Sequence, residues 1–306
     1  MRLLVTGGAG FIGSNFVHHV LDTTDHHVVT LDSLTYAGDT GNLPGVLDSD
    51  RHRFVEGDIR DEQLVGELVS ESDVIVNFAA ESHVDRSIKD AEPFVSTNVD
   101  GTRTLLDAAV THGIERFVQI STDEVYGTIE SGSVAEDASL DPRNPYSATK
   151  ASADLLTLSY HTTHDLPVLI TRSSNNYGPR QHREKLIPKF ITRAAGGENL
   201  PVYGDGSNVR EWMYVEDNCR AIMAVLEDGV PGEVYNVGSD MELTNLEVTN
   251  EILNLVGGSE DQIEFVEDRP GHDHRYSLDT TKIRVLGWQP QCEFKDALKK
   301  TAEFYL

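Results

Sequence analysis

Short apolar runs recur along the first part of the chain, and longer stretches with helical spacing separate them. The runs are rich in Val, Ile, Leu and Phe and are nearly continuous, which is typical of strands buried on both faces of a sheet. They predict strands at residues 2–7, 27–32, 52–58, 73–80, 116–122 and 167–173.

The stretches between these runs read as amphipathic helices. Residues 94–113 are one example, and this stretch ends on Gly113, a residue suited to the left-handed conformation that closes many helices. Strands that alternate with helices favour a parallel sheet with right-handed crossovers. The pattern therefore predicts an α/β protein with a Rossmann-type, doubly wound parallel sheet.

After about residue 173 the pattern changes, because Pro and Gly become frequent and the periodic segments shorten. Helical spacing remains at residues 188–197, 216–229, 244–258 and 293–305. We therefore predict a division into residues 1–173, the Rossmann domain, and 174–306, a smaller mixed α/β region set over the carboxyl edge of the sheet. Some of its segments are expected to return to the first region.

Composition narrows the class of protein. The 306 residues carry 51 acidic against 25 basic side chains, a net charge of −26. Nucleic-acid binding requires a basic surface, so this class is excluded. The dispersed acidic charge suggests a salt-loving source, with an ordinary acidic cytosolic enzyme as the alternative.

Targeting and metal signals are weak. No apolar run is long enough to span a bilayer, and the first residues read as a strand and a glycine turn rather than a signal peptide. The chain is expected to be soluble and cytoplasmic. Cys219 and Cys292 belong to no metal-spaced cluster, and the His residues show no ligand spacing, so no metal is expected.

The first strand runs into a glycine motif. In VTGGAGFIGS, Gly7, Gly10 and Gly13 stand between a predicted strand and a predicted helix. This context predicts close backbone approach to a dinucleotide pyrophosphate at the helix N-terminus. Asp32 ends the second strand, where a carboxylate can bind both ribose hydroxyls and repel a 2′-phosphate, which favours NAD over NADP. Asp58, after the third strand, could accept from the adenine amino group.

A second motif carries candidate chemistry. In YSATK, Tyr146 and Lys150 share one face of a predicted helix. A nearby ammonium and a nicotinamide positive charge would lower the pKa of the phenol, which would make it a usable base. The stretch STDEVYG adds the hydroxyl of Thr122 and two adjacent carboxyls, Asp123 and Glu124, at a strand end.

These motifs together resemble the extended short-chain dehydrogenase/reductase family. Further stretches, LDSLTYAGD, FAAESHVDRSI, RSSNNYGPRQHREKLIP, PVYGDGSNVREWMYVED and RPGHDHRYSLD, are similar to those of its dTDP-glucose 4,6-dehydratase group over nearly the whole chain. The resemblance implies that a tightly bound NAD takes a hydride from C4 of dTDP-glucose and returns it to C6. Between these steps Glu124 would take the C5 proton and Asp123 would protonate the departing 6-hydroxyl. The resemblance also implies a homodimer.

The resemblance assigns binding residues position by position. Besides the three glycines, Asp32 and Asp58, it implies cofactor contacts by Phe11, Ile12, Ser33, Leu34, Thr35, Ile59, Phe78, Ala79, Ala80, Ser82, Thr97, Tyr146, Lys150 and Asn176. The implied substrate contacts are Ser82, Thr122, Asn175, Lys185, Leu186, Pro201, Val202, Tyr203, Arg210, Asn245 and residues 268–272, with Arg269 and His272 among them.

Two departures and three alternatives remain open. Ser33 and Arg183 stand where relatives often have lysine and proline, which leaves the shape of two binding loops open. A sugar-nucleotide 4-epimerase or a UDP-glucuronate decarboxylase would use the same Thr–Tyr–Lys oxidation, but neither shares the requirement for Asp123 next to Glu124. A non-catalytic NAD-sensing module would tend to lose Tyr146 or Lys150.

Overall fold

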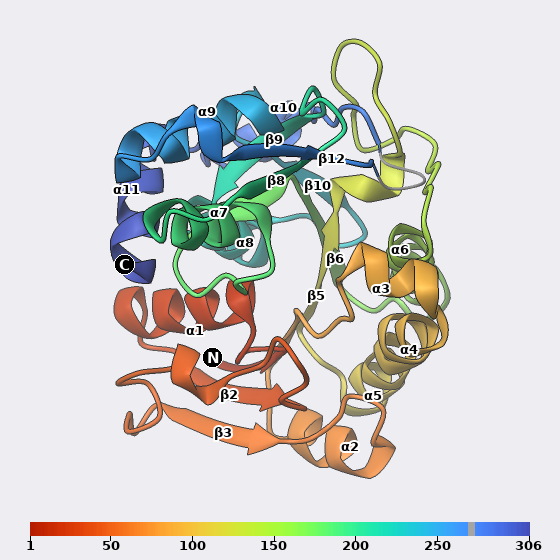
Figure 1. The fold of residues 1–306 in the computed structure, drawn as a ribbon. Coiled ribbons are helices and arrows are strands. Elements are labelled where there is room, and N and C mark those ends of the chain that lie inside the picture. The colour runs from red at the N-terminus through yellow and green to blue at the C-terminus, as the bar shows by residue number, and fades with distance from the viewer. Residues whose placement is uncertain (269–272) are drawn as a thin grey trace.

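The computed structural model describes residues 1–268 and 273–306. Its centre is a parallel sheet with the strand order β10–β6–β5–β4–β1–β2–β3 (Figure 1). The order reverses between β1 and β4, so the predicted doubly wound sheet is confirmed. The strand bounds are β1 Arg2–Thr6, β2 His27–Asp32, β3 His52–Glu56, β4 Val74–Asn77, β5 Arg116–Thr122, β6 Val168–Ser173 and β10 Val234–Val237.

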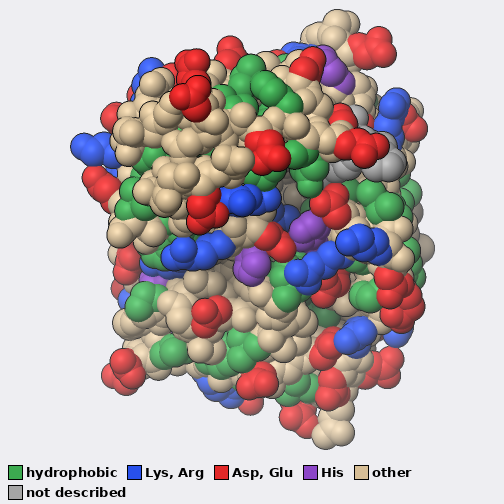
Figure 2. Space-filling view, in the orientation of Figure 1, with side chains coloured by type: hydrophobic (Ala, Val, Ile, Leu, Met, Phe, Trp, Pro, Cys, Tyr) green, Lys and Arg blue, Asp and Glu red, His purple; other side chains and the backbone are tan. Residues whose placement is uncertain are grey.

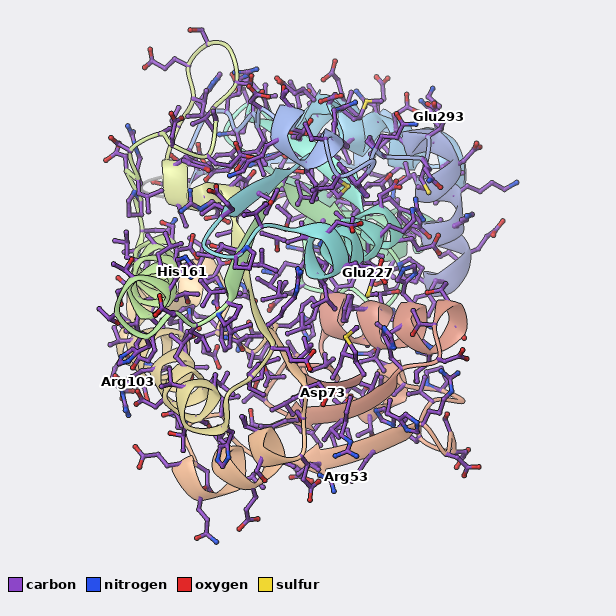
Figure 3. All side chains as sticks on the ribbon, turned by 180° about the vertical axis from the view of Figure 1, so that it is seen from behind. Arg53, Asp73, Arg103, His161, Glu227 and Glu293 are labelled. Carbon is purple, nitrogen blue, oxygen red and sulfur yellow. The ribbon has the colours of Figure 1, made fainter. Side chains whose placement is uncertain are left out.

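Helices cover both faces of this sheet. Adjacent residues of one strand point to opposite faces, so Leu3 packs toward α1 and α8 while Leu4 packs toward α2 and α5. From behind (Figure 3), His161 on α6 and Glu227 on α8 mark the two helical layers. The helix bounds are α1 Phe11–Thr23, α2 Glu62–Ser70, α5 Thr102–His112, α6 Pro145–His164 and α8 Val215–Asp228.

The helix predicted over residues 94–113 is built from three pieces. The three pieces are the last residue of α4 (Glu92–Phe94), a π-helical segment, η2 (Val95–Gly101), and α5. The short helix α3 (Val84–Lys89) precedes them. The predicted end is confirmed, since Gly113 is left-handed with φ of 69°. The wide π turns are compatible with the inward position of Asn98, whose amide holds the backbone of Glu81 and the hydroxyl of Thr149.

The later part of the chain forms two small sheets and further helices. The four predicted helices are confirmed within two residues at each end, as α7 Leu186–Ala195, α8, α9 Asn245–Val256 and α11 Phe294–Tyr305. The short strands were not predicted: β7 Asn175–Tyr177, β9 Val209–Tyr214 and β11 Glu242–Thr244 form one sheet, and β8 Leu200–Tyr203 pairs with β12 Ile263–Val266. The remaining short elements are η1 Thr40–Asn42, η3 Asp123–Tyr126, η4 Glu260–Gln262 and α10 Thr281–Arg284.

One hydrophobic cluster joins the two parts. It runs from Val5 and Phe16 beside the central sheet to Tyr177, Trp212 and Phe294 in the later part. Strand β10 of the later part also completes the central sheet beside β6. The boundary at residue 173 stays a prediction. In the described parts of the chain, no helix combines the length and the apolar character needed to cross a bilayer.

Candidate active site

A cavity of about 440 Å³ lies along the carboxyl ends of β1, β2, β4 and β5. These ends meet at the point where the strand order reverses, which is the usual ligand position in such sheets. Figure 2 shows Lys, Arg and His side chains along the hollow that crosses the middle of this face. Arg60, His182 and Lys185 are among the residues that line the cavity.

The glycine turn forms one wall of the cavity. Gly7 has a φ of 67°, and a Cβ on Gly13 would lie 2.3 Å from the carbonyl oxygen of Gly7. No side chain fits at Gly13, so the backbone before α1 stays bare and its N–H groups can face an anion. This arrangement fits a dinucleotide pyrophosphate.

Asp32 stands at the end of β2, beside the glycine turn. Its carboxylate accepts hydrogen bonds from the N–H groups of Ala9 and Leu34, both at 2.9 Å. Burial raises the pKa of Asp32, and the backbone N–H donors oppose that rise. The carboxylate is therefore fixed by both neighbouring loops, in a position suited to ribose hydroxyls.

Most of the predicted cofactor residues line this one cavity. The lining includes Gly7, Gly10, Phe11, Ile12, Gly13, Asp32, Ser33, Thr35, Asp58, Ile59, Phe78, Ala79, Ala80, Ser82, Thr97, Tyr146 and Lys150. Leu34 and Asn176 are outside the lining. Leu34 instead donates its N–H to Asp32, and Asn176 accepts from the side chain of Gln181. Asp58 is paired with Arg60 at 2.6 Å, which lowers the pKa of Asp58.

Thr122 is the last residue of β5, and the two acids follow it directly. The chain turns there into η3, and the Thr122 hydroxyl oxygen accepts from the N–H of Glu124 at 3.3 Å. The same hydroxyl donates to Oδ1 of Asp123 at 3.1 Å. One side chain therefore fixes the turn and orients the first carboxyl.

Asp123 is suited to keep its proton. Its side chain is 2% exposed, and burial raises its pKa well above the ordinary value, with further increases from the charges of Glu124 and Glu211. Its Oδ2 atom has no hydrogen-bond partner among the described residues. A buried, protonated carboxyl with an open oxygen can act as a proton donor.

The helix that carries Tyr146 and Lys150 is capped by Asn144. The Asn144 side-chain oxygen accepts from the N–H of Ser147 at 2.9 Å, and Pro145 occupies the first turn. The Asn144 amide also donates to Oε2 of Glu124 at 3.4 Å. The helix start predicted at Asn144 and Pro145 is thus confirmed, and the contact with Glu124 is new.

Burial shifts the pKa values of Tyr146 and Lys150 in opposite directions. Burial raises the pKa of Tyr146, and the charges of Glu124 and Asp123 add to the rise, while a hydrogen bond with Thr122 opposes it. Burial lowers the pKa of Lys150 to about 8, and its ammonium donates to the carbonyl oxygen of Ile120 at 2.6 Å. The expected low phenol pKa is therefore not produced by the chain's own groups.

Fewer of the predicted substrate residues than of the predicted cofactor residues line the cavity. Ser82 and Lys185 line the cavity, whereas its lining does not include Thr122, Asn175, Leu186, Pro201, Val202, Tyr203, Arg210 and Asn245. The Val202 side chain is 2% exposed and packs in the hydrophobic core, so only its backbone could meet a ligand. Arg269 and His272 lie outside the described residues.

Arg210 is predicted to bind the diphosphate, and its guanidinium already has partners. It donates to the carbonyl oxygens of Val209, Asp273 and His274 and lies 4.6 Å from the ring centroid of Tyr276. The guanidinium is held by these contacts, and its charge also acts on Asp123.

Several buried polar atoms near the carboxyl edge of the sheet have no partner in the described structure. They are Ser121 Oγ, Asp123 Oδ2, Ser174 Oγ, Asn175 Oδ1, Asn176 Oδ1 and Gln181 Oε1. Buried polar atoms are normally hydrogen-bonded, so this group fits a polar ligand. Sequence reasoning missed Ser174 and, among the residues that line the cavity, Tyr36, Gln181 and Glu184. Ser174, Gln181 and Glu184 lie in the motif stretch 172–188, and Tyr36 lies in the motif stretch 31–39.

The fold and the Thr–Tyr–Lys arrangement beside a dinucleotide cradle define a short-chain dehydrogenase/reductase of the extended type. The sequence model described as GDP-mannose 4,6 dehydratase matches residues 4–301, and the chain belongs to that family. Within it, the chain resembles the dTDP-glucose 4,6-dehydratases.

Three relatives illustrate the similarity. The low-salt glycan biosynthesis protein Agl12 of Haloferax volcanii is 69% identical and covers 100% of this chain and 99% of its own length. A dTDP-glucose 4,6-dehydratase of Streptomyces niveus is 53% identical over 100% of this chain and 93% of its own. The crystal structure of DesIV, a dTDP-glucose 4,6-dehydratase from Streptomyces venezuelae with NAD bound, superposes with a TM-score of 0.97 at 53% identity, covering 100% of this chain and 97% of DesIV.

Proposed function

We propose that this chain is an NAD-dependent dTDP-glucose 4,6-dehydratase that forms dTDP-4-keto-6-deoxyglucose. The observation that carries the proposal is Asp123, a buried carboxyl suited to hold a proton, which stands next to Glu124 and acts electrostatically on Tyr146. Loss of water from a sugar needs a base and an acid at adjacent carbons, and this pair supplies both.

The first proton transfer belongs to Tyr146. Bound NAD⁺ supplies the chemistry of hydride acceptance from C4 and of later hydride return to C6. Tyr146 receives the proton of the 4-hydroxyl on its phenol oxygen, and Thr122 hydrogen-bonds that phenol. Because burial and the charges of Glu124 and Asp123 raise the pKa of Tyr146, we expect the lowering to come from the charge of the bound cofactor.

The second stage belongs to the two acids. Glu124 takes the proton from C5, which is acidified by the ketone at C4, and Asp123 delivers its proton to the 6-hydroxyl, which leaves as water. Glu124 then returns a proton to C5. The hydroxyl of Thr122 holds Asp123 in place, and the amide of Asn144 holds Glu124.

The alternative reactions use less of this site. A 4-epimerase or a UDP-glucuronate decarboxylase needs Tyr146 and Lys150 but not the proton donor Asp123. A non-catalytic NAD-sensing module needs none of the three. The buried position of Asp123 and its hydrogen bond from Thr122 therefore favour the dehydratase reaction over the other functions of this fold.

A substrate panel tests the proposal. Purified protein should convert dTDP-glucose into a 4-keto-6-deoxy product, identified by mass and by its ultraviolet absorbance in alkali, without added NAD. UDP-, GDP- and CDP-glucose measure the base preference. Glu124→Gln should keep NAD and stop water loss, while Glu130→Gln, an exposed acid in the following loop, should behave as wild type. A 4-epimer product, or no turnover with any hexose nucleotide, contradicts the proposal.

Two further features belong to the proposal. We expect a homodimer, because Leu155 on α6 and Val110 on α5 leave 59% and 36% of their area exposed on neighbouring helices. Light scattering of Leu155→Asp should then report a monomer. We also expect the product to serve deoxysugar biosynthesis of the rhamnose type. The name of the Haloferax volcanii relative supports a role in glycan biosynthesis.

A further inference from the structure

We propose that Gln181 is a further ligand of the bound dinucleotide and that Tyr305, at the end of the last helix, is the positioning residue that holds Gln181 in place. The inference rests on the proposed function only in that the chain must bind NAD. Gln181 lies in the motif stretch 172–188, but neither residue is among the binding residues assigned from the sequence.

The Gln181 side chain is fixed at one end and open at the other. It lines the cofactor cavity, and its amide nitrogen donates to the carbonyl oxygen of Asn176 at 2.9 Å. Its Oε1 atom is buried and has no partner among the described residues. An open buried acceptor suits an N–H or O–H donor, and a dinucleotide offers its carboxamide group and its ribose hydroxyls.

The backbone around Gln181 must be held. Arg180 has a φ of 70°, a left-handed conformation that is costly for a residue with a side chain. The Arg180 guanidinium donates to the Asn15 side-chain oxygen at 2.8 Å, and the Asn15 amide donates to the carbonyl oxygen of Pro179 at 3.0 Å. These contacts tie the segment to α1 on the side before Gln181.

Tyr305 supplies the tie at Gln181 itself. Its hydroxyl donates to the carbonyl oxygen of Gln181 at 2.5 Å and lies 3.4 Å from that of Gly178. The Tyr305 side chain is buried, and the Arg183 guanidinium lies 5.5 Å from its ring centroid. Arg183, one of the two departures from the family pattern, thus adds a cation–π contact to the same tie.

The hydroxyl of Tyr305 is therefore the link between α11 and the cavity wall. Removing this one oxygen frees the carbonyl of Gln181 without disturbing the aromatic ring, its packing or its contact with Arg183. Removing the Gln181 carboxamide deletes the ligand contact directly. If Tyr305 acts through Gln181, the two changes share one effect on cofactor affinity.

The experiment measures NAD affinity by calorimetry on nucleotide-stripped protein, together with the NAD content of freshly purified protein. Gln181→Leu should weaken NAD binding about 10-fold, as expected for the loss of a buried hydrogen bond. Tyr305→Phe should weaken it by about 3-fold or more. The double variant should be no weaker than Gln181→Leu alone, because coupled residues do not add.

Two matched controls separate this role from a structural one. Tyr235→Phe removes a buried phenol hydroxyl that accepts from Val230, and Gln262→Leu removes an amide that donates to Ala194 and Glu198. Both should bind NAD as wild type does. An unchanged NAD affinity in Gln181→Leu overturns the ligand role. The positioning role is overturned if the losses of NAD affinity add up in the double variant, or if Tyr305→Phe lowers the melting temperature without weakening NAD binding. Wild-type protein that binds no NAD would instead refute the proposed function.

Discussion

Asn144 holds Glu124 with the same side chain that caps the helix carrying Tyr146 and Lys150. Its oxygen accepts from the N–H of Ser147 at 2.9 Å, and its nitrogen donates to Oε2 of Glu124 at 3.4 Å. The proposed C5 base and the proposed C4 base are therefore fixed relative to one another through a single amide. A short polar residue that caps the helix but cannot reach Glu124 would separate these two roles.

Asn144→Ser is that change, since serine caps helices as well as asparagine does. We expect an unfolding free energy close to wild type and a kcat lowered about 10-fold, because Glu124 loses a hydrogen bond that orients it. Exchange of the C5 hydrogen with deuterated water should slow in parallel. Asn144→Ala should show the same kcat and a further loss of about 1 kcal/mol in stability. Wild-type exchange in Asn144→Ser would show that the amide does not orient Glu124.

Asp123→Asn should make the protein more stable and nearly inactive. Because the folded pKa of Asp123 is raised above its unfolded value, the folded chain binds more protons than the unfolded one, and stability falls as pH rises past the unfolded pKa. Asparagine does not ionise, so its gain in melting temperature should be larger at about pH 8 than at about pH 5. The kcat should fall by about 100-fold or more for loss of the proton donor.

Asp48→Asn is the control for this change, because Asp48 is exposed and lies far from the acids of η3 along the chain. Its melting temperature should follow the wild-type pH curve. If Asp123→Asn gave a pH-independent shift, the carboxyl would be ionised in the folded protein, and its assignment as the proton donor would be wrong.

The first half of the fold was predictable because its signals are local. Strands such as Leu3 to Val5 must be apolar on both faces, and the turn at Gly13 admits no side chain. Each requirement therefore produces a recognisable pattern within a few consecutive residues. Strands β8 and β12 have no such sequence pattern. Each has four residues, and they pair from positions 200 and 263, so only the tertiary structure brings them together.

The site divides in the same way. Thr122 and Asp123 are adjacent, and Tyr146 and Lys150 are one helical turn apart, so their spacing alone predicted a shared site. The contact of Tyr305 with Gln181 joins residues that are far apart in the sequence, and no periodicity predicts it. In the chain without ligand, burial raises the pKa of Tyr146, so the low phenol pKa that the motif suggests depends on a bound nicotinamide and stays a prediction.

Gly13→Ala should abolish tight NAD binding. The added Cβ would lie 2.3 Å from the carbonyl oxygen of Gly7, and the backbone must move to relieve this contact, which displaces the N–H groups that face the pyrophosphate. We expect NAD affinity to fall by about 10-fold or more, measured by calorimetry.

Gly66→Ala is the matched control for Gly13→Ala. Gly66 lies inside α2, and a Cβ there meets no atom within 4 Å. The change should stabilise the protein by about 0.5–1 kcal/mol in denaturant unfolding and leave NAD binding unaltered. Equal NAD affinities for the two variants would show that the turn at Gly13 is not the pyrophosphate cradle.

Salt should promote substrate capture. The chain carries a net charge of −26, so at low salt its field repels a doubly charged nucleotide sugar, although Arg60 and Lys185 line the cavity. Screening shortens the reach of this field from about 30 Å at 0.01 M to about 3 Å at 1 M, while the contact charges inside the cavity keep most of their effect. We expect kcat/KM to rise with KCl over this range, through a lower KM.

A charge-reduced variant tests whether the distant acids cause this dependence. Asp48→Asn, Asp50→Asn, Glu227→Gln and Glu293→Gln remove four exposed charges, and Figure 3 shows Glu227 and Glu293 from the side opposite the hollow of Figure 2. Combined, they should raise kcat/KM at low salt and flatten its dependence on KCl, because repulsion at a distance depends on net charge. Sucrose, which adds no ions, should reproduce neither effect. A kcat/KM that falls steadily with KCl would mean that attraction to the cavity outweighs the field of the whole chain.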